Sequence, residues 1–88
     1  MTENKVQMQP TPNPNSMKFV LSKAVVPSGM LTFENPAETA SSPLASRLFG
    51  VEGVTGVFMM NDFVSVNKVP GGNWGEIAPK VMEILKAF

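Results

Sequence analysis

The side chains of this chain best suited to acid–base chemistry or to a hard-metal site are carboxylates, because the sequence contains no histidine, cysteine or tyrosine. General acid–base and nucleophilic catalysis draw heavily on the three missing types. A hard-metal site needs several converging oxygen ligands, and only Glu34 and Glu38 lie close together in the sequence. We therefore expect solvated carboxylates, with no catalytic residue and no metal ligand. The seven are Glu3, Glu34, Glu38, Glu52, Asp62, Glu76 and Glu83.

Two further patterns have a chemical and a structural interpretation. Seven methionines could supply thioethers to Cu(I), but Met59 and Met60 point to opposite faces of a strand, and methionine commonly fills cores. Gly71-Gly72-Asn73 could bind an anion before a helix, but the Lys-Ser/Thr of a phosphate-binding loop is missing. We expect core methionines and a plain turn with a helix cap.

Length and charge limit the function classes. The 88 residues predict one domain over 1–88, with residues 1–5 flexible. Seven basic and seven acidic residues give zero net charge, which argues against nucleic-acid binding. The polar N-terminus and the lack of a long apolar run predict a cytoplasmic protein that makes no membrane contact.

The segment around Asn13, Pro14 and Asn15 is the feature that folding explains least. It is either a rigid clasp held by local side-chain hydrogen bonds or a pre-ordered recognition segment, and the two are compatible. Arg47 and Asp62 are expected at exposed positions beside a helix and at a hairpin tip. These five residues are our candidate protein-binding site. Trp74 is either a lid on the core or an interface anchor.

Alternation of apolar and polar residues predicts the strands. Residues 54–60 are apolar on both faces, which favours a central strand. Asn61-Asp62 should form a two-residue hairpin turn with positive φ angles. The prolines exclude regular structure over residues 10–14. The expected strands cover residues 6–9, 17–22, 31–34, 54–60 and 64–67.

Three segments carry helix signals. Asn35-Pro36-Ala37-Glu38 resembles the start of a single helical turn. Ser42-Pro43 begins a helix over 43–49, which Gly50 should end in the left-handed conformation. Asn73 caps the last helix, in which Pro79 should cause a bend or delay regular structure until Pro79. The apolar stripe of that helix is Trp74, Ile77, Val81, Ile84, Leu85 and Phe88.

The resulting order, β-β-β-α-β-β-α, predicts an α+β fold. One mixed or antiparallel sheet should carry two helices packed on one face. The residues that we expect first in the core are Phe19, Val57, Val64, Ile77, Val81 and Leu85.

Several short motifs follow one another along the chain, each occurring once. They are Pro-Thr-Pro-Asn-Pro-Asn-Ser-Met-Lys-Phe at 10–19, Ser-Pro-Leu-Ala at 42–45, Leu-Phe-Gly-Val-Glu-Gly-Val at 48–54, Val-Phe at 57–58, Asp-Phe-Val-Ser-Val at 62–66, and Trp74. Over about residues 7–88 the chain resembles the N-terminal domain of Nfu/NifU-type iron–sulfur scaffold proteins. The family fold that this resemblance implies is of the same kind.

The resemblance implies a part in assembling or delivering iron–sulfur clusters. In the family a separate domain with a Cys-x-x-Cys pair holds the cluster, and no such ligand can be carried over to this chain. We expect no cofactor on the chain alone. We expect a non-enzymatic accessory role through contacts with a Cys-x-x-Cys NifU-like scaffold protein or with iron–sulfur client apoproteins. The alternatives are a general interaction module unconnected with iron and a small-molecule-binding or enzymatic domain.

Overall fold

The computed structural model describes residues 5–26, 29–35, 37 and 42–87. Its elements follow the predicted order β-β-β-α-β-β-α. They are β1 (Val6–Pro10), β2 (Ser16–Leu21), β3 (Met30–Phe33), α1 (Pro43–Phe49), β4 (Val54–Met60), β5 (Phe63–Lys68) and α2 (Trp74–Lys86).

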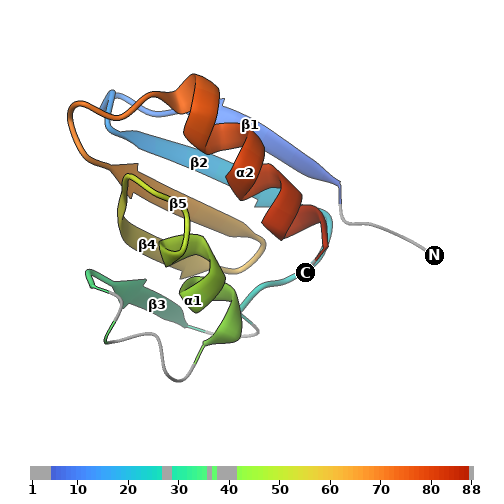
Figure 1. The fold of residues 1–88 in the computed structure, drawn as a ribbon. Coiled ribbons are helices and arrows are strands. Elements are labelled where there is room, and N and C mark those ends of the chain that lie inside the picture. The colour runs from blue at the N-terminus through green and yellow to red at the C-terminus, as the bar shows by residue number, and fades with distance from the viewer. Residues whose placement is uncertain (1–4, 27–28, 36, 38–41, 88) are drawn as a thin grey trace.

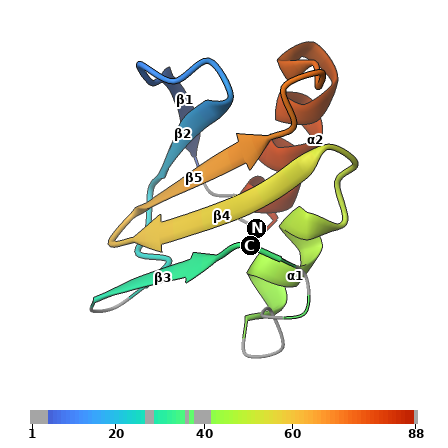
Figure 2. The same ribbon diagram turned by 90° about the vertical axis from the view of Figure 1, so that its left-hand side faces the viewer.

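The strands form one sheet in the order β1-β2-β5-β4-β3, in which every neighbouring pair is antiparallel. β1 and β3 are the two edge strands, and β4 lies inside the sheet as expected. Both helices lie on the same face, with α2 over β1 and β2 and α1 beside β4 and β3 (Figures 1 and 2). The predicted α+β fold is confirmed, and its sheet is antiparallel rather than mixed.

The core forms where the helix-facing positions of the central strands meet. Phe19 lies opposite Val64, and Val64 lies opposite Met59 on the next strand. Residues directly opposite each other share a face, so these side chains point together towards the helices. All six predicted core residues are buried, and Phe19 has no exposed surface.

Helix α1 begins where the sequence predicts. The Ser42 hydroxyl accepts a hydrogen bond from the Ala45 N–H (3.2 Å), and Pro43 occupies the first turn, where its missing N–H breaks no bond. The prediction for its end is wrong, because Gly50 has φ −70° and ψ −12°. Gly50 stays right-handed since its N–H continues the helical pattern onto the carbonyls of Ser46 and Arg47.

Helix α2 is continuous from Trp74, so the prediction that it becomes regular only from Pro79 is wrong. Its first turn is fixed by Asn73, whose side chain accepts the Gly75 N–H (2.8 Å) and whose carbonyl accepts the Ile77 N–H. Pro79 removes one bond that the Gly75 carbonyl would accept, and the cap holds that turn without it. No helix in the described ranges is both long and apolar enough to cross a bilayer.

The predictions for the Asn61-Asp62 turn and for Pro10 need correction, and a predicted helix start lies partly outside the described residues. The β4–β5 loop is the expected two-residue Asn61-Asp62 turn, but only Asn61 has a positive φ angle, of 53°. Pro10 is the last residue of β1 and pairs with Met17, which an edge strand permits for a residue without an N–H. The helix start predicted at Asn35-Pro36-Ala37-Glu38 includes Pro36 and Glu38, which are not described.

Candidate functional site

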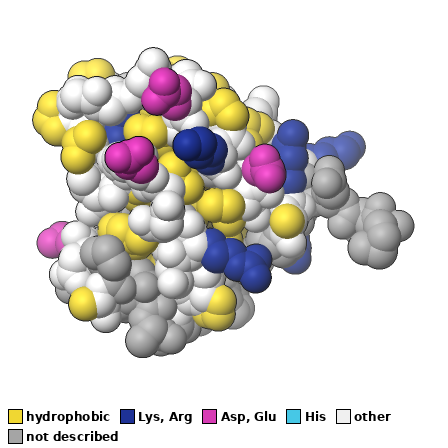
Figure 3. All heavy atoms as spheres, in the orientation of Figure 1, with side chains coloured by type: hydrophobic (Ala, Val, Ile, Leu, Met, Phe, Trp, Pro, Cys, Tyr) yellow, Lys and Arg dark blue, Asp and Glu magenta, His cyan; other side chains and the backbone are white. Residues whose placement is uncertain are grey.

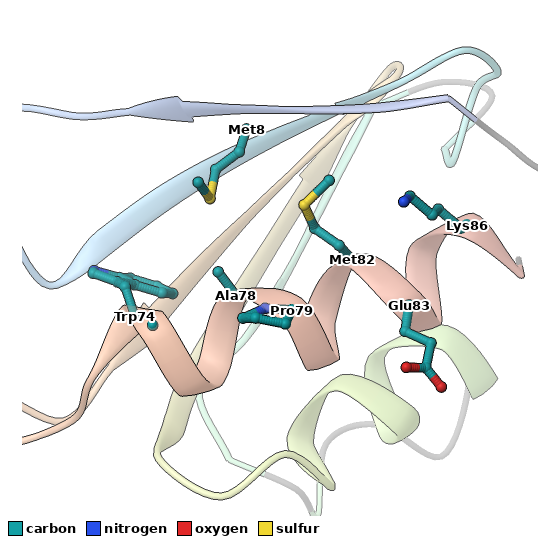
Figure 4. Close-up of a pocket in the computed structure, with 8 residues that line it drawn as sticks. Met8, Trp74, Ala78, Pro79, Met82, Glu83 and Lys86 are labelled. Atoms are coloured by element: carbon teal, nitrogen blue, oxygen red, sulfur yellow. The ribbon is translucent and has the colours of Figure 1, made fainter.

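An apolar cleft of about 530 Å³ lies between edge strand β1 and helix α2 (Figure 4). Met8 projects into it from β1, and Trp74 and Met82 approach it from the helix. Sequence reasoning missed this site, because it predicted that the methionines pack in the core. The residues that line the cleft are Met8, Trp74, Gly75, Ala78, Pro79, Met82, Glu83 and Lys86.

The cleft follows from the way α2 carries two neighbouring stripes. The first stripe is buried against the central strands and consists of Ile77, Val81 and Leu85. The second, Trp74, Ala78 and Met82, has the same four-residue spacing and therefore lies beside the first on the helix surface. The small side chain of Ala78 between two large ones leaves the space that faces Met8.

Met8 is on the helix-facing side of the sheet because it lies opposite the buried Phe19. It nevertheless keeps 44% of its surface exposed, because β1 is the outermost strand and α2 covers it only in part. The prediction of core methionines holds for Met59, which is buried. It is wrong for Met8, and also for Met30 on edge strand β3 and for Met60 opposite it on β4, which are exposed.

The proline–asparagine segment contacts Trp74, which lines the cleft, and makes the clasp contacts that we expected. The Asn13 side chain accepts the N–H of Asn15 (2.9 Å), and the Asn13 carbonyl accepts the N–H of Ser16 (3.0 Å). The Pro14 carbonyl accepts the indole N–H of Trp74 (2.9 Å). This bond ties the β1–β2 turn to the first turn of α2, so it fixes the Trp74 ring at the mouth of the cleft.

A second set of contacts joins the same segment to β5 through Lys68. The Asn15 carbonyl accepts the Lys68 N–H (2.8 Å), and the Asn15 side-chain oxygen accepts from the Lys68 ammonium (2.9 Å). Lys68 is only 8% exposed, and its ammonium also lies 5.8 Å from the centre of the Trp74 ring. Sequence reasoning missed Lys68, although it continues the inward alternation of Val64 and Val66.

The five predicted protein-binding residues do not form one surface. Asn13, Pro14 and Asn15 lie together at the end of β5 where Lys68 is, whereas Asp62 lies in the turn before β5 begins. The six residues of β5 separate these points by roughly 17–20 Å. Arg47 is exposed on α1 and lines a separate hollow of about 440 Å³ with Leu31 and Met59.

No described element covers the sheet face away from the helices (Figure 2), and that face carries apolar side chains. Phe58 and Phe63 lie side by side with their ring centres 5.9 Å apart, and the Lys18 ammonium lies 4.5 Å from the Phe63 ring centre. Met60 is beside them in the register and partly exposed. The far side of the sheet is therefore a second accessible apolar surface.

Comparison with known proteins decides the family. The family model described as "Scaffold protein Nfu/NifU N terminal" matches residues 6–88. The chain belongs to the Nfu/NifU N-terminal family. It is 44% identical over 85 residues to the NFU1 iron-sulfur cluster scaffold homolog, mitochondrial, of Drosophila grimshawi. The matched region covers 94% of this chain but only 28% of that protein. The chain spans less than a third of the length of the curated relatives that it matches first.

Solved structures share the fold of this Nfu/NifU N-terminal domain. Protein SAV1430 from Staphylococcus aureus matches with a TM-score of 0.80 at 33% identity, covering 91% of this chain and 96% of that one. A NifU-like protein from Saccharomyces cerevisiae matches with a TM-score of 0.84 at 25% identity, covering 96% and 76%. The predicted resemblance and the predicted fold are both confirmed.

The residues of this Nfu/NifU N-terminal domain do not fit an iron–sulfur cluster. Such clusters are held by cysteine thiolates, with histidine replacing some of them in Rieske centres, and the chain has neither residue. Where the structure describes the chain, no three carboxylates gather to form a metal site. Five predicted solvated carboxylates are exposed, namely Glu34, Glu52, Asp62, Glu76 and Glu83. Glu3 and Glu38 are not described.

The glycine pair before α2 is a turn and cap, as expected. The Gly72 N–H donates to the Val69 carbonyl (2.9 Å), which closes the turn, and Asn73 then caps the helix. Basic and acidic side chains are interspersed over the helix-bearing face (Figure 3). With zero net charge, this face offers no continuous cationic surface for a phosphate backbone.

Proposed function

We propose that the chain is a non-enzymatic accessory domain of iron–sulfur cluster assembly or delivery, acting through protein–protein contacts. The observation that carries the proposal is an accessible apolar cleft on a family member without cysteine or histidine. A cluster is then cargo that a partner holds, and this chain contributes a docking surface. The partner is a Cys-x-x-Cys NifU-like scaffold protein or an iron–sulfur client apoprotein.

The composition of the cleft supports binding rather than catalysis. Its lining is mainly methionine, tryptophan, alanine and proline, and its two ionisable residues are Glu83 and Lys86. Pockets for small polar substrates usually bring several polar groups to one point. An apolar lining beside an edge strand instead resembles the surfaces that receive protein segments.

The deciding experiment follows cluster transfer from a loaded Cys-x-x-Cys NifU-like protein to an apoprotein client by visible circular dichroism. We expect the chain to bind the loaded protein in calorimetry and to raise the transfer rate. Met82→Asp, which puts a charge in the cleft, should abolish both effects. Met30→Asp makes the same change at a residue that does not line the cleft and should leave both intact.

Two outcomes would overturn the proposal. Transfer that is unchanged at a saturating concentration of the chain, without detectable binding, removes the connection with iron. Capture only of proteins unrelated to iron–sulfur clusters would favour the general interaction module. The cytoplasmic location stays a prediction, since the matched fly relatives are named mitochondrial, and fractionation of the source cells tests it.

A further inference from the structure

We propose that the outer edge of β1 and the cleft beside it bind an extended segment of a partner protein as a sixth strand. One large apolar side chain of that segment would enter the cleft next to Met8. This inference rests on the proposed function, because it names the kind of partner segment that the docking surface accepts. It goes further by giving the register of the contact.

The hydrogen bonds around β1 show which of its backbone groups face outward. The Lys5 N–H donates to the Ser22 hydroxyl (3.1 Å) and so faces β2. Leu21, which lies opposite Val6, donates its N–H to the Asp62 carbonyl (2.7 Å), away from β1. Backbone groups alternate in direction along an antiparallel strand, so those of Val6 point away from β2.

The same alternation turns the backbone groups of Met8 and Pro10 outward. The position of Pro10 agrees, because a residue without an N–H is tolerated at an outward-facing position of an edge strand. β1 pairs with β2 alone among the described strands. Its outer edge therefore offers two N–H donors, at Val6 and Met8, and three carbonyl acceptors, at Val6, Met8 and Pro10.

The register of the added strand places its side chains. A residue that exchanges hydrogen bonds with Met8 lies directly opposite it and presents its side chain to the same face. On that face lies the cleft lined by Trp74, Ala78 and Met82 (Figure 4). Its volume of about 530 Å³ is within the usual range for binding pockets, so it can receive a leucine or an aromatic side chain.

The charges beside the cleft favour an acidic segment. α2 runs from Trp74, which contacts the β1–β2 turn, towards the start of β1, so Lys86 lies at the Val6 end. Lys5 directly precedes β1. Figure 4 shows Lys86 on the β1 side of α2, whereas the Glu83 carboxylate points away from β1. An incoming strand would therefore find the ammonium groups of Lys5 and Lys86 just past the residue that it places opposite Val6. Carboxylates at that position of the strand would be favoured.

A second copy of this chain fits the edge less well than a foreign segment. Antiparallel pairing of β1 with another β1 about Met8 would set Pro10 opposite Val6. Pro10 has no N–H to give to the Val6 carbonyl, so each copy would lose one of the available bonds. Self-pairing would also bring no acidic residue to Lys5, since β1 and the turn after it contain none.

The test begins with selection from a displayed library of random twelve-residue peptides on the whole chain. We expect selected peptides to share a large apolar residue, with further apolar residues two positions away and carboxylates at one end. A selected peptide should protect the Val6 and Met8 amides from hydrogen exchange. No enrichment overturns the inference, as does a motif with helical three- and four-residue spacing.

Backbone pairing is tested by methylating the peptide nitrogen of the residue that pairs with Met8. The loss of one hydrogen bond should weaken binding roughly threefold to tenfold, while methylation of the next nitrogen along, which faces away from β1, should have less effect. The protein variant Met8→Pro removes the outward N–H, and Met8→Val is its matched control. Equal affinities for both peptides, or for two folded variants, would refute strand addition.

The two proposals can fail separately. If the selected peptide binds β1 but does not compete with cluster transfer, the edge site stands and the iron–sulfur role falls. If the chain accelerates transfer and neither the peptide nor Met8→Pro changes the rate, the role stands and the β1 site is refuted.

Discussion

Replacing Asn15 with alanine should destabilise the protein more than its partial exposure suggests. The substitution removes the side-chain oxygen that accepts from the Lys68 ammonium at 2.9 Å. Lys68 is only 8% exposed, and its remaining hydrogen-bond partner is the Val69 carbonyl at 3.3 Å. A hydrogen bond to a charged group contributes about 1.5–3 kcal/mol, and an unsatisfied buried charge adds to the loss. We expect a loss of about 2–3 kcal/mol in the free energy of unfolding.

Urea denaturation followed by Trp74 fluorescence measures this loss, and calorimetry should show a melting temperature lower by roughly 10–20 °C. Asn13→Ala is the matched control, because among the described residues the Asn13 side chain accepts a hydrogen bond only from the exposed N–H of Asn15. It should cost about 1 kcal/mol or less. Lys68→Met added to Asn15→Ala should recover part of the stability, since replacing both partners by apolar groups leaves no polar group unpaired.

A different result would refute the reasoning. If Asn15→Ala costs no more than Asn13→Ala, the Lys68 ammonium finds water or another acceptor in solution, and the segment is not a clasp. If the double variant is as unstable as the sum of its two single variants, the bond between Asn15 and Lys68 does not couple them.

Three further predictions concern the core, the cargo and the candidate contact residues. Phe19→Ala should cost about 3–5 kcal/mol in urea denaturation because Phe19 has no exposed surface, and a loss below about 1 kcal/mol would contradict the burial of that side chain. Anaerobic reconstitution with iron and sulfide should leave no visible absorption bands after desalting, because the chain has no thiolate ligand; a stable coloured complex would refute this. Arg47→Glu should leave both the melting temperature and capture of the NifU-like partner unchanged, since Arg47 is exposed and lines a hollow separate from the cleft between β1 and α2; a weaker calorimetric affinity would place Arg47 in the interface.

Local patterns were enough to predict most of the secondary structure. The alternation from Met17 to Leu21, the Ser42-Pro43 start and the Asn73 cap each depend on residues within a few positions of one another. The errors arose at residues whose type permits more than one backbone conformation, so that the local sequence did not decide between them. Gly50 tolerates a left-handed angle but does not require it, and Pro79 lies in a helix whose first turn the cap already holds.

The candidate site was less accessible to prediction than the strands. The sequence singled out Asn13, Pro14 and Asn15 correctly as a segment with side-chain hydrogen bonds. It did not show that their partners would be Lys68 and Trp74. These contacts join residues more than fifty positions apart, and no local pattern specifies them.

The sequence by itself determined the order of the elements, the inward face of each central strand and the absence of thiolate and imidazole ligands. Only the tertiary structure decided that β1 is an edge strand and that the cleft opens beside it. Two helices, each about 10 Å across, span about the same width as five strands spaced roughly 4.8 Å apart. Met8 on β1 and Leu31 on β3 face the helices from the two edge strands and stay partly exposed, whereas Phe33 on β3 is buried, because coverage depends on how the layers stack and not on the alternation within a strand.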